Sequence, residues 1–294
     1  MYIISQLLNG LQLGAIYALI AIGYTMVYGI VKLINFAHGD IMMAGAYFVL
    51  LLLRSGVPLL VAIPIAMLAC AVLGMAIDQI AYKPLRHSTR LSALITAIGV
   101  SLLLQNVFML VFSPDPEPFP DFISALPVIR LGANQINSIG LITIAVAVII
   151  MILLHLFVRR TRIGQAMRAV SEDYETASLM GINVNKTISI TFAIGSALAA
   201  LAAAFYVISY QLVDPYMGSL PGLKAFIAAV LGGIGILPGA MLGGFVLGLA
   251  EGLTKAVIPS ELSQLSDAVV YLILIIVLLV KPTGLLGRSQ SEKV

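Results

Sequence analysis

Residues 1–31 read MYIISQLLNGLQLGAIYALIAIGYTMVYGIV and contain no charged side chain. A helix needs about 20 mostly apolar residues to cross the hydrocarbon core of a bilayer, whereas a helix in a soluble core does not need so long an apolar run. The rest of the chain repeats this pattern, because 61% of its 294 residues are hydrophobic and only 10% are charged. We therefore expect an all-α, polytopic bundle of helices in a lipid bilayer, with no role in nucleic-acid binding.

Charge-free runs predict eight or nine membrane crossings, depending on whether the shorter runs span completely. The longer runs cover residues 4–27, 57–77, 91–112, 139–158, 187–209 and 263–280, and the short or glycine-rich ones cover 41–53, 220–234 and 240–257. No polar segment between them is long enough to build a soluble core of its own. We expect residues 1–294 to form a single transmembrane domain.

The positive charges indicate an orientation. If the crossings alternate strictly, all but four of the 16 Lys and Arg residues lie on the same side as Lys32, and the exceptions are Arg54, Arg130, Lys224 and Lys255. Loops rich in Lys and Arg face the cytoplasm. This predicts a cytoplasmic C-terminus and an outer N-terminus, and it requires nine crossings.

Two segments should break the helical pattern, and they supply candidates for a translocation path. Residues 34–40 (INFAHGD) precede a run of only 13 uncharged residues, and residues 232–239 (GGIGILPG) combine glycines with a proline. Interrupted helices of this kind mark binding sites in transporters, although two tight turns between spans are the plainer alternative. The candidates are Asn35, Gly39, Asp40, Gly232, Gly233 and Gly239.

The polar residues at the first break, and its similarity to the second, lead to further expectations. Asp40 is placed to cap the N-terminus of the following helix, although an ionisable residue in a membrane segment is also a functional candidate. Asn35 can hold the turn through its side chain. GDIMMAGA at 39–46 resembles LPGAMLGG at 237–244, which suggests an internal duplication whose symmetry the sequence leaves open.

The polar segment 159–186 should contain a short amphipathic helix. An apolar stripe recurs every three or four residues, and Gly181 should end the helix, which we place at 163–179. The stripe consists of Ile163, Met167, Val170, Tyr174 and Ala177. The other face carries three acidic residues, which an anionic lipid surface would repel, so a groove on a partner protein is the better docking site.

Within this segment, ETASLMG at 175–181 resembles the E-A-A-x-x-x-G loop of ATP-binding-cassette importer permeases. Ala177 matches the second alanine, whereas Thr176 replaces the first. Other stretches, in the same order, are similar to the LivH-type permeases of the branched-chain amino acid importer family. They are LGAIYAL (13–19), GYTMVYGI (23–30), 34–40, 164–170 with 179–184, 232–244 and KPTGLLG (281–287).

The resemblance implies a permease subunit in a bacterial or archaeal inner membrane, without catalytic, metal or cofactor sites of its own. It implies as partners two ATP-binding cassette subunits that hydrolyse ATP, a second permease subunit, identical or different, and an extracytoplasmic substrate-binding protein. The docked loop would transmit ATPase movement through Arg168, Glu175, Ala177 and Gly181. Related permeases carry branched-chain or other amino acids, urea or short amides.

An ATP-independent channel or facilitator for a small polar solute is the alternative function. A channel of aquaporin type would need paired Asn-Pro-Ala turns, but the first break reads Asn35-Phe36-Ala37 and the second has no Asn. An intramembrane enzyme is disfavoured, because the spans contain no Ser/His or paired-carboxylate arrangement.

Overall fold

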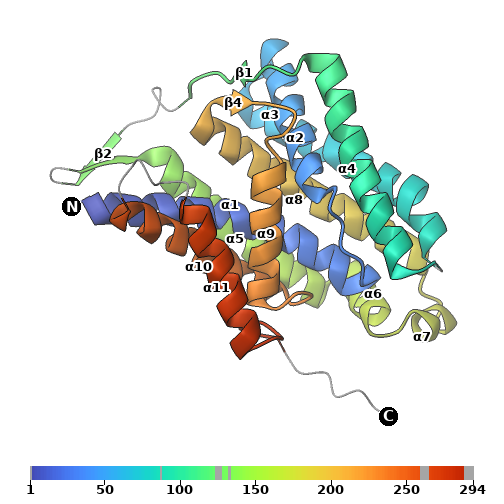
Figure 1. The fold of residues 1–294 in the computed structure, drawn as a ribbon. Coiled ribbons are helices and arrows are strands. Elements are labelled where there is room, and N and C mark those ends of the chain that lie inside the picture. The colour runs from blue at the N-terminus through green and yellow to red at the C-terminus, as the bar shows by residue number, and fades with distance from the viewer. Residues whose placement is uncertain (1, 87, 123–127, 132–133, 259–264, 288–294) are drawn as a thin grey trace.

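The computed structural model describes residues 2–86, 88–122, 128–131, 134–258 and 265–287, and most of them are helical (Figure 1). The helices are α1 (Tyr2–Val31), α2 (His38–Arg54), α3 (Leu59–Ile77), the π-helical turn η1 (Asp78–Tyr82), the 3-10 turn η2 (Lys83–Leu85), α4 (Arg90–Phe112), α5 (Ser138–Arg160), α6 (Arg162–Glu172), α7 (Tyr174–Leu179), α8 (Val184–Tyr210), α9 (Ser219–Gly232), α10 (Leu237–Val257) and α11 (Leu265–Val280). Short antiparallel pairs are formed by β1 (Glu117–Pro118) with β4 (Leu212–Val213), and by β2 (Val128–Leu131) with β3 (Asn134–Asn137).

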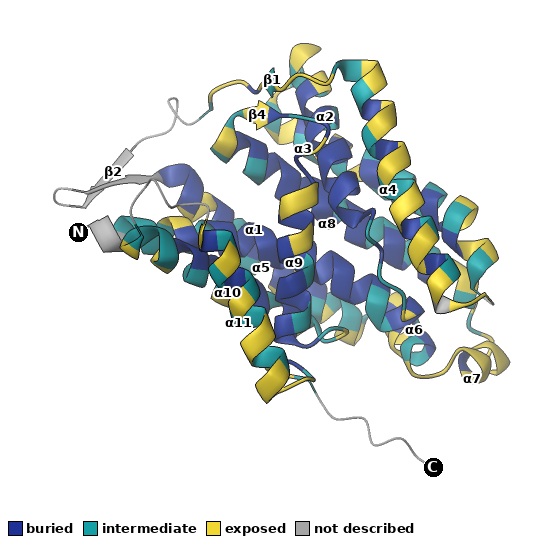
Figure 2. Cartoon of the chain, viewed as in Figure 1, coloured by how far each residue is buried: buried dark blue, intermediate teal, exposed yellow. Residues whose placement is uncertain are grey.

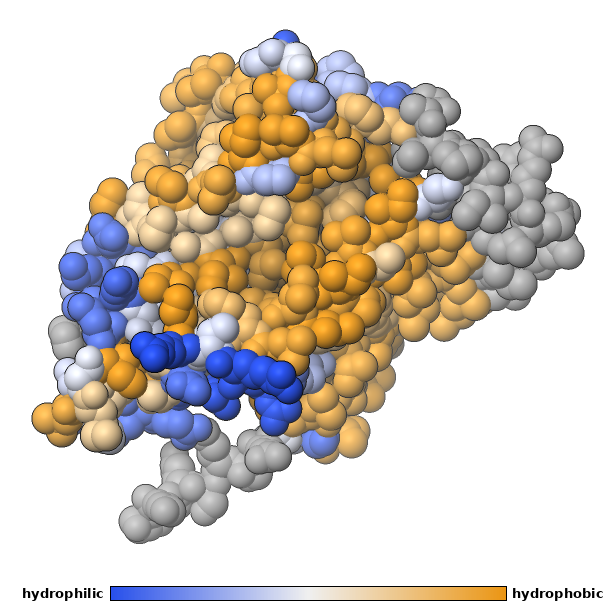
Figure 3. Space-filling model, turned by 180° about the vertical axis from the view of Figure 1, so that it is seen from behind, coloured by the Kyte–Doolittle hydropathy of each residue, from blue (hydrophilic) through white to orange (hydrophobic). Residues whose placement is uncertain are grey.

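The expectation of an all-α membrane bundle is confirmed. Within the described residues, six helices are long and apolar enough to cross a membrane. α2, α9 and α11 are shorter, with 17, 14 and 16 residues, and the total of eight or nine crossings stays a prediction. The outward faces of α4, α5 and α11 carry large apolar side chains, and the back of the molecule is a broad hydrophobic surface with polar residues gathered at one end (Figures 2 and 3).

Two long antiparallel helices, α1 and α8, form the buried centre of the bundle (Figure 2). Gln12 near the start of α1 donates a hydrogen bond to Ser209 near the end of α8, at 2.7 Å. Farther along, Gly23 approaches the backbone of Gly195. Small residues permit such close contacts, which stabilise helix pairs in lipid. α10 packs along α1, and α3 packs along α8.

The bundle has two distinct ends (Figure 1). The first residues of α1 and the strands lie at one end, which we call the strand end. The loop helices α6 and α7 and the last described residues lie toward the other, which we call the α7 end. Each of α3, α4, α5, α8 and α10 runs between the two ends.

The chain contains an inverted repeat, in which α1–α2–α3 corresponds to α8–α9–α10. The same backbone features recur 179 residues apart in two segments with dissimilar sequences. A residue in the left-handed region follows α1 and α8, and a glycine with positive φ follows α2 and α9: Lys32 and Gln211 both have φ 57°, and Gly56 and Gly235 have φ 82° and 92°. Because α1 and α8 are antiparallel, the two copies have opposite orientations, as in many transporters.

This repeat corrects the predicted duplication. Residues 34–40 do break the helix, although the irregular part is 32–37 and α2 already begins at His38. Their structural counterpart is the segment 211–218 between α8 and α9, and not residues 232–239 as the sequence suggested. The hydrogen bond from His38 N to Asn35 O (3.1 Å) recurs there from Met217 N to Asp214 O (3.2 Å). Within residues 232–239, only 233–236 form the turn that joins α9 to α10, and the others belong to the two helices.

Candidate functional site

The first residues of α2 and α9 meet inside the bundle, and we call this meeting point the half-helix junction. The backbones of Gly39 and Gly218 touch so closely that a methyl group on either would overlap the other residue's carbonyl group. Next to them, the ring of His38 packs against Tyr24 of α1, with 4.6 Å between centroids. Tyr24 lies about 10 Å before the end of α1, at 1.5 Å per residue. Both half-helices therefore begin within the bundle and direct their partially positive ends toward one another.

Asp40 occupies this junction and accepts hydrogen bonds from another helix. Its side chain is buried, and Oδ1 accepts from Gln105 Nε2 of α4 at 2.8 Å. Gln105 Nε2 also lies 3.4 Å from the Ser219 hydroxyl in α9. The predicted capping role is wrong, because Ala37 is the N-cap of α2 and Asp40 lies in its first turn. A carboxylate there offsets the positive ends of the helices, so the protein itself already supplies an anion at this point.

Asn35 connects the break before α2 to a neighbouring helix turn. Its Oδ1 accepts a hydrogen bond of 2.7 Å from the Tyr82 hydroxyl in η1, and both residues are buried. The side chain therefore joins two elements, whereas the sequence suggested that it would stabilise its own turn. A cavity of about 250 Å³ lies on the other side of the junction, lined by Gly39, Asp40 and Ser219 among others.

Gly232, Gly233 and Gly239 lie apart from the junction, in the turn between α9 and α10 at the α7 end. Gly232 and Gly239 are in backbone contact across the turn. The C-terminal segment covers it, since the backbone N–H of Leu286 donates to the carbonyl of Gly232 at 3.0 Å. The six predicted path residues thus divide between two places, and only Gly39, Asp40 and the nearby Asn35 are brought together.

The polar loop contains two helices where the sequence predicted one spanning 163–179. Asp173 interrupts the helix with an extended backbone (φ −155°) and caps α7 by accepting a hydrogen bond from Thr176 N at 2.9 Å. Gly181 ends α7 with φ +84°, as predicted. Its N–H donates to Ser178 O at 3.0 Å, and the following N–H donates to Ala177 O. An aspartate on the polar side of an amphipathic pattern can continue a helix or cap a new one. Because Asp173 caps α7, the segment forms two helices where the pattern predicted one.

One face of α6 and α7 packs on the bundle, and the other is exposed. Met167, Val170 and Ala177 are buried, as the stripe predicted, whereas Ile163 and Tyr174 are exposed by 41% and 37%. Arg168 and Glu175 lie on the exposed side. Just after Ala177, Leu179 and Met180 are 87% and 79% exposed. Exposed apolar side chains of this size are typical of a surface that contacts another protein or the membrane.

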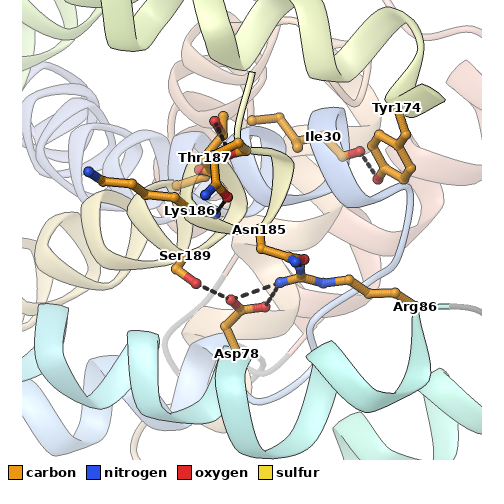
Figure 4. A network of polar contacts seen from close by, with 10 residues as sticks. Ile30, Asp78, Arg86, Tyr174, Asn185, Lys186, Thr187 and Ser189 are labelled. Atoms are coloured by element: carbon orange, nitrogen blue, oxygen red, sulfur yellow. Dashed lines mark hydrogen bonds and ion pairs between the residues drawn. The ribbon is translucent and has the colours of Figure 1, made fainter. Parts of the chain in front are cut away.

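Polar contacts attach this loop and its neighbours to the ends of three long helices (Figure 4). Asp78, fully buried in η1, accepts from Arg86 at 2.7 and 2.9 Å and from Ser189 of α8 at 2.6 Å. Arg86 also donates to Asn185, at the start of α8. On the other side, the Tyr174 hydroxyl of α7 donates to the carbonyl of Ile30 in α1. This hydrogen bond connects α7 directly to α1.

A second group of polar residues, which sequence reasoning did not single out, joins α9, α10 and α11. Lys224 Nζ lies 3.1 Å from Glu251 Oε2 and 2.7 Å from Asp267 Oδ1. Glu251 also accepts from Lys255 Nζ at 2.7 Å and from the Tyr17 hydroxyl of α1 at 3.0 Å. We call these five residues the charged cluster. The alternation of crossings assigned Lys224 and Lys255 to an outer side. The structure places them in this cluster, where α1, α9, α10 and α11 meet.

The whole chain is similar to one family of membrane proteins. Residues 6–278 match the family model described as the permease component of branched-chain amino acid transport systems. The permease LivH of the high-affinity branched-chain amino acid transport system of Escherichia coli K12 is 44% identical over 306 aligned residues, covering 100% of this chain and 98% of that protein.

Two further relatives extend the comparison. The permease BraD of the corresponding Pseudomonas aeruginosa system is 44% identical and covers 99% of this chain and 98% of its own length. A probable branched-chain amino acid permease LivH of the archaeon Methanocaldococcus jannaschii is 27% identical, covering 93% of this chain and 89% of its own length.

Proposed function

This chain belongs to the family of permease components of branched-chain amino acid transport systems, and we propose from that premise that it carries branched-chain or closely related amino acids across the inner membrane. It is a permease subunit and not an enzyme, since ATP is hydrolysed on a separate subunit. The observation that best supports a driven mechanism is the exposed apolar end of α7, formed by Leu179 and Met180.

In this proposal two ATP-binding cassette subunits bind the α6–α7 loop, and a second permease chain, identical or different, completes the path. An extracytoplasmic binding protein delivers the amino acid at the strand end. Glu175 and Arg168 face the ATPase, whereas Ala177 and Gly181 keep α7 in shape. When the ATPase subunits close on ATP they displace α7, and the hydrogen bond from Tyr174 to Ile30 transmits this displacement to α1.

The charge distribution supports a cytoplasmic α7 end. Of the residues at or near that end, ten carry positive charge: Lys32, Lys83, Arg86, Arg90, Arg159, Arg160, Arg162, Arg168, Lys186 and Lys281. Such an excess is typical of cytoplasmic loops. The C-terminus then lies in the cytoplasm and the strands lie outside.

Reconstitution into liposomes tests the proposal. Vesicles holding this chain with its partner permease and ATPase subunits should accumulate radiolabelled L-leucine only with internal ATP and external loaded binding protein. Vesicles holding the permease chains alone should not take it up. Uptake by the chain alone, without ATPase, would establish the ATP-independent facilitator instead.

A further inference from the structure

The charged cluster extends from the middle of α1 to the strand end of the bundle, because Lys255 lies in the last turn of α10 and Asp267 in the first turn of α11. Tyr17 stands about 22 Å from either end of α1, at 1.5 Å per residue. Its hydroxyl contacts Glu251, whose side chain is only 3% exposed, and the Lys224 side chain is only 8% exposed. The Lys255 and Asp267 side chains are 34% and 35% exposed. Buried charges such as Glu251 and Lys224 are costly in membrane helices and usually serve a function. Substrate sites of transporters commonly lie between the repeats and beside interrupted helices such as α9.

A cavity of about 260 Å³ opens beside these charges. Two tyrosines of α8, Tyr206 and Tyr210, line it together with Leu220 and Pro221 at the start of α9. The cavity therefore offers two cations, two anions and an apolar wall. Among the described residues, the cavity of similar size at the half-helix junction is lined by a single charged side chain, Asp40, and by no cation.

The fold itself does not require the cluster. By the 179-residue offset, Gly45 of α2 stands where Lys224 stands in α9. α3, the counterpart of α10, has no charged residue between Leu59 and Ile77. At that position Gly45 packs against Ala200 of α8 and near Cys70 of α3. The corresponding position of the first repeat thus packs without charged side chains, so the charges in the second repeat are not a requirement of the repeated fold.

We propose that this cavity binds the main chain of the transported amino acid, an inference that rests on the proposed function. The ammonium group is held by Glu251 and Asp267, and the carboxylate by Lys224 and Lys255. The aliphatic side chain lies against Leu220 and Pro221. A zwitterion suits the cluster because it is neutral overall. Its ammonium group replaces the lysines as the partner of the carboxylates, and its carboxylate replaces the carboxylates as the partner of the lysines. A solute with one charge would leave a buried protein charge unpaired, which is strongly unfavourable.

Thermal unfolding of the purified complete importer, without its binding protein, tests the inference. A ligand that binds the folded state raises the midpoint of unfolding. L-leucine should raise it, whereas isoamylamine, which lacks the carboxylate, and 4-methylpentanoate, which lacks the ammonium, should not. Equal shifts with all three compounds, or no shift with L-leucine, would overturn the assignment.

A double variant, Lys224→Met with Glu251→Met, separates binding from stability. It removes a cation and an anion together, and apolar replacement of a buried ion pair is often neutral or stabilising. The variant importer should fold, lose the shift caused by L-leucine, and lose uptake by about tenfold or more, the loss expected for a charge-assisted hydrogen bond. A folded double variant with normal uptake and a normal shift refutes the site. If instead the unaltered importer shows no ATP-driven uptake, the proposed function fails.

Discussion

At the scale of the residue, the interior is organised by glycines that let backbones meet and by polar groups that must find partners. Gly39 and Gly218 belong to the first kind, because neither tolerates a Cβ atom without moving the other helix. Asp40 and Lys224 belong to the second, and each is buried against partners from another helix. Changing either kind therefore disturbs contacts between elements and not merely within one.

Gly218→Val should destabilise the half-helix junction, because the side chain would overlap the backbone of Gly39. Overpacking of this kind costs about 1–3 kcal/mol. The midpoint of thermal unfolding of the purified importer should fall accordingly. Gly99→Ala is the matched control, since a Cβ atom there meets nothing within 4 Å, and it should leave the midpoint unchanged or slightly raised. Equal midpoints for Gly218→Val and the parent would mean that the junction is not closely packed.

Tyr174→Phe should weaken the link between α7 and α1. Burial raises the pKa of the Tyr174 phenol above its usual value, so the hydroxyl stays protonated and donates to Ile30 at physiological pH. Losing this bond costs about 1 kcal/mol. We expect less ATP-driven L-leucine uptake at an unchanged amount of chain in the membrane. Tyr216→Phe, which removes only a hydroxyl contact to the Met109 sulfur at the strand end, is the control; an equal effect of both variants would exclude a specific role for Tyr174.

At the scale of the element, charge-free runs locate the long helices well, because a helix satisfies all its backbone hydrogen bonds within one lipid-embedded segment. Helix ends are harder to predict. The amphipathic loop contained all the residues of α6 and α7, but nothing in its period showed that Asp173 would cap a second helix. Gly and Pro indicated the break at 232–239. The break at 211–218 was not predicted, because Gln211 adopts a left-handed conformation that is unusual for glutamine.

Asp173→Ala should unravel the first turn of α7. Loss of an N-cap costs about 1 kcal/mol, which corresponds to about fivefold faster hydrogen exchange of the α7 amides. Asp173→Asn should behave like the parent, because asparagine caps as well as aspartate. Mass-spectrometric hydrogen exchange over residues 174–179 measures this. Protection that is the same in all three proteins would show that α7 does not depend on this cap.

At the scale of the whole molecule, the inverted repeat arranges everything else. It brings the starts of α2 and α9 together in the interior and leaves the charged cluster on one side only. The sequence hinted at a duplication but matched the wrong pair of segments. The true pair, 34–40 and 213–219, shares only the glycine at its sixth position, so backbone geometry and not residue identity reveals it.

The proposed orientation predicts where single cysteines react with a membrane-impermeant thiol reagent. Leu179→Cys in α7 should be labelled only in inside-out vesicles, and Leu212→Cys in β4 only in right-side-out vesicles, because both side chains are exposed at opposite ends. The natural Cys70 is buried and serves as the unlabelled background. The reverse pattern would invert the assignment of the ends.

The most direct test of the account measures L-leucine uptake and ATP hydrolysis together in liposomes containing the complete importer with Gly181→Val or Glu175→Lys. A branched side chain at Gly181 opposes its φ of +84°, at a cost of about 1–2 kcal/mol. If α7 transmits the movement of the ATPase, both variants should insert normally and keep basal hydrolysis, while uptake per ATP falls about tenfold. Unchanged uptake per ATP in both variants would contradict the account.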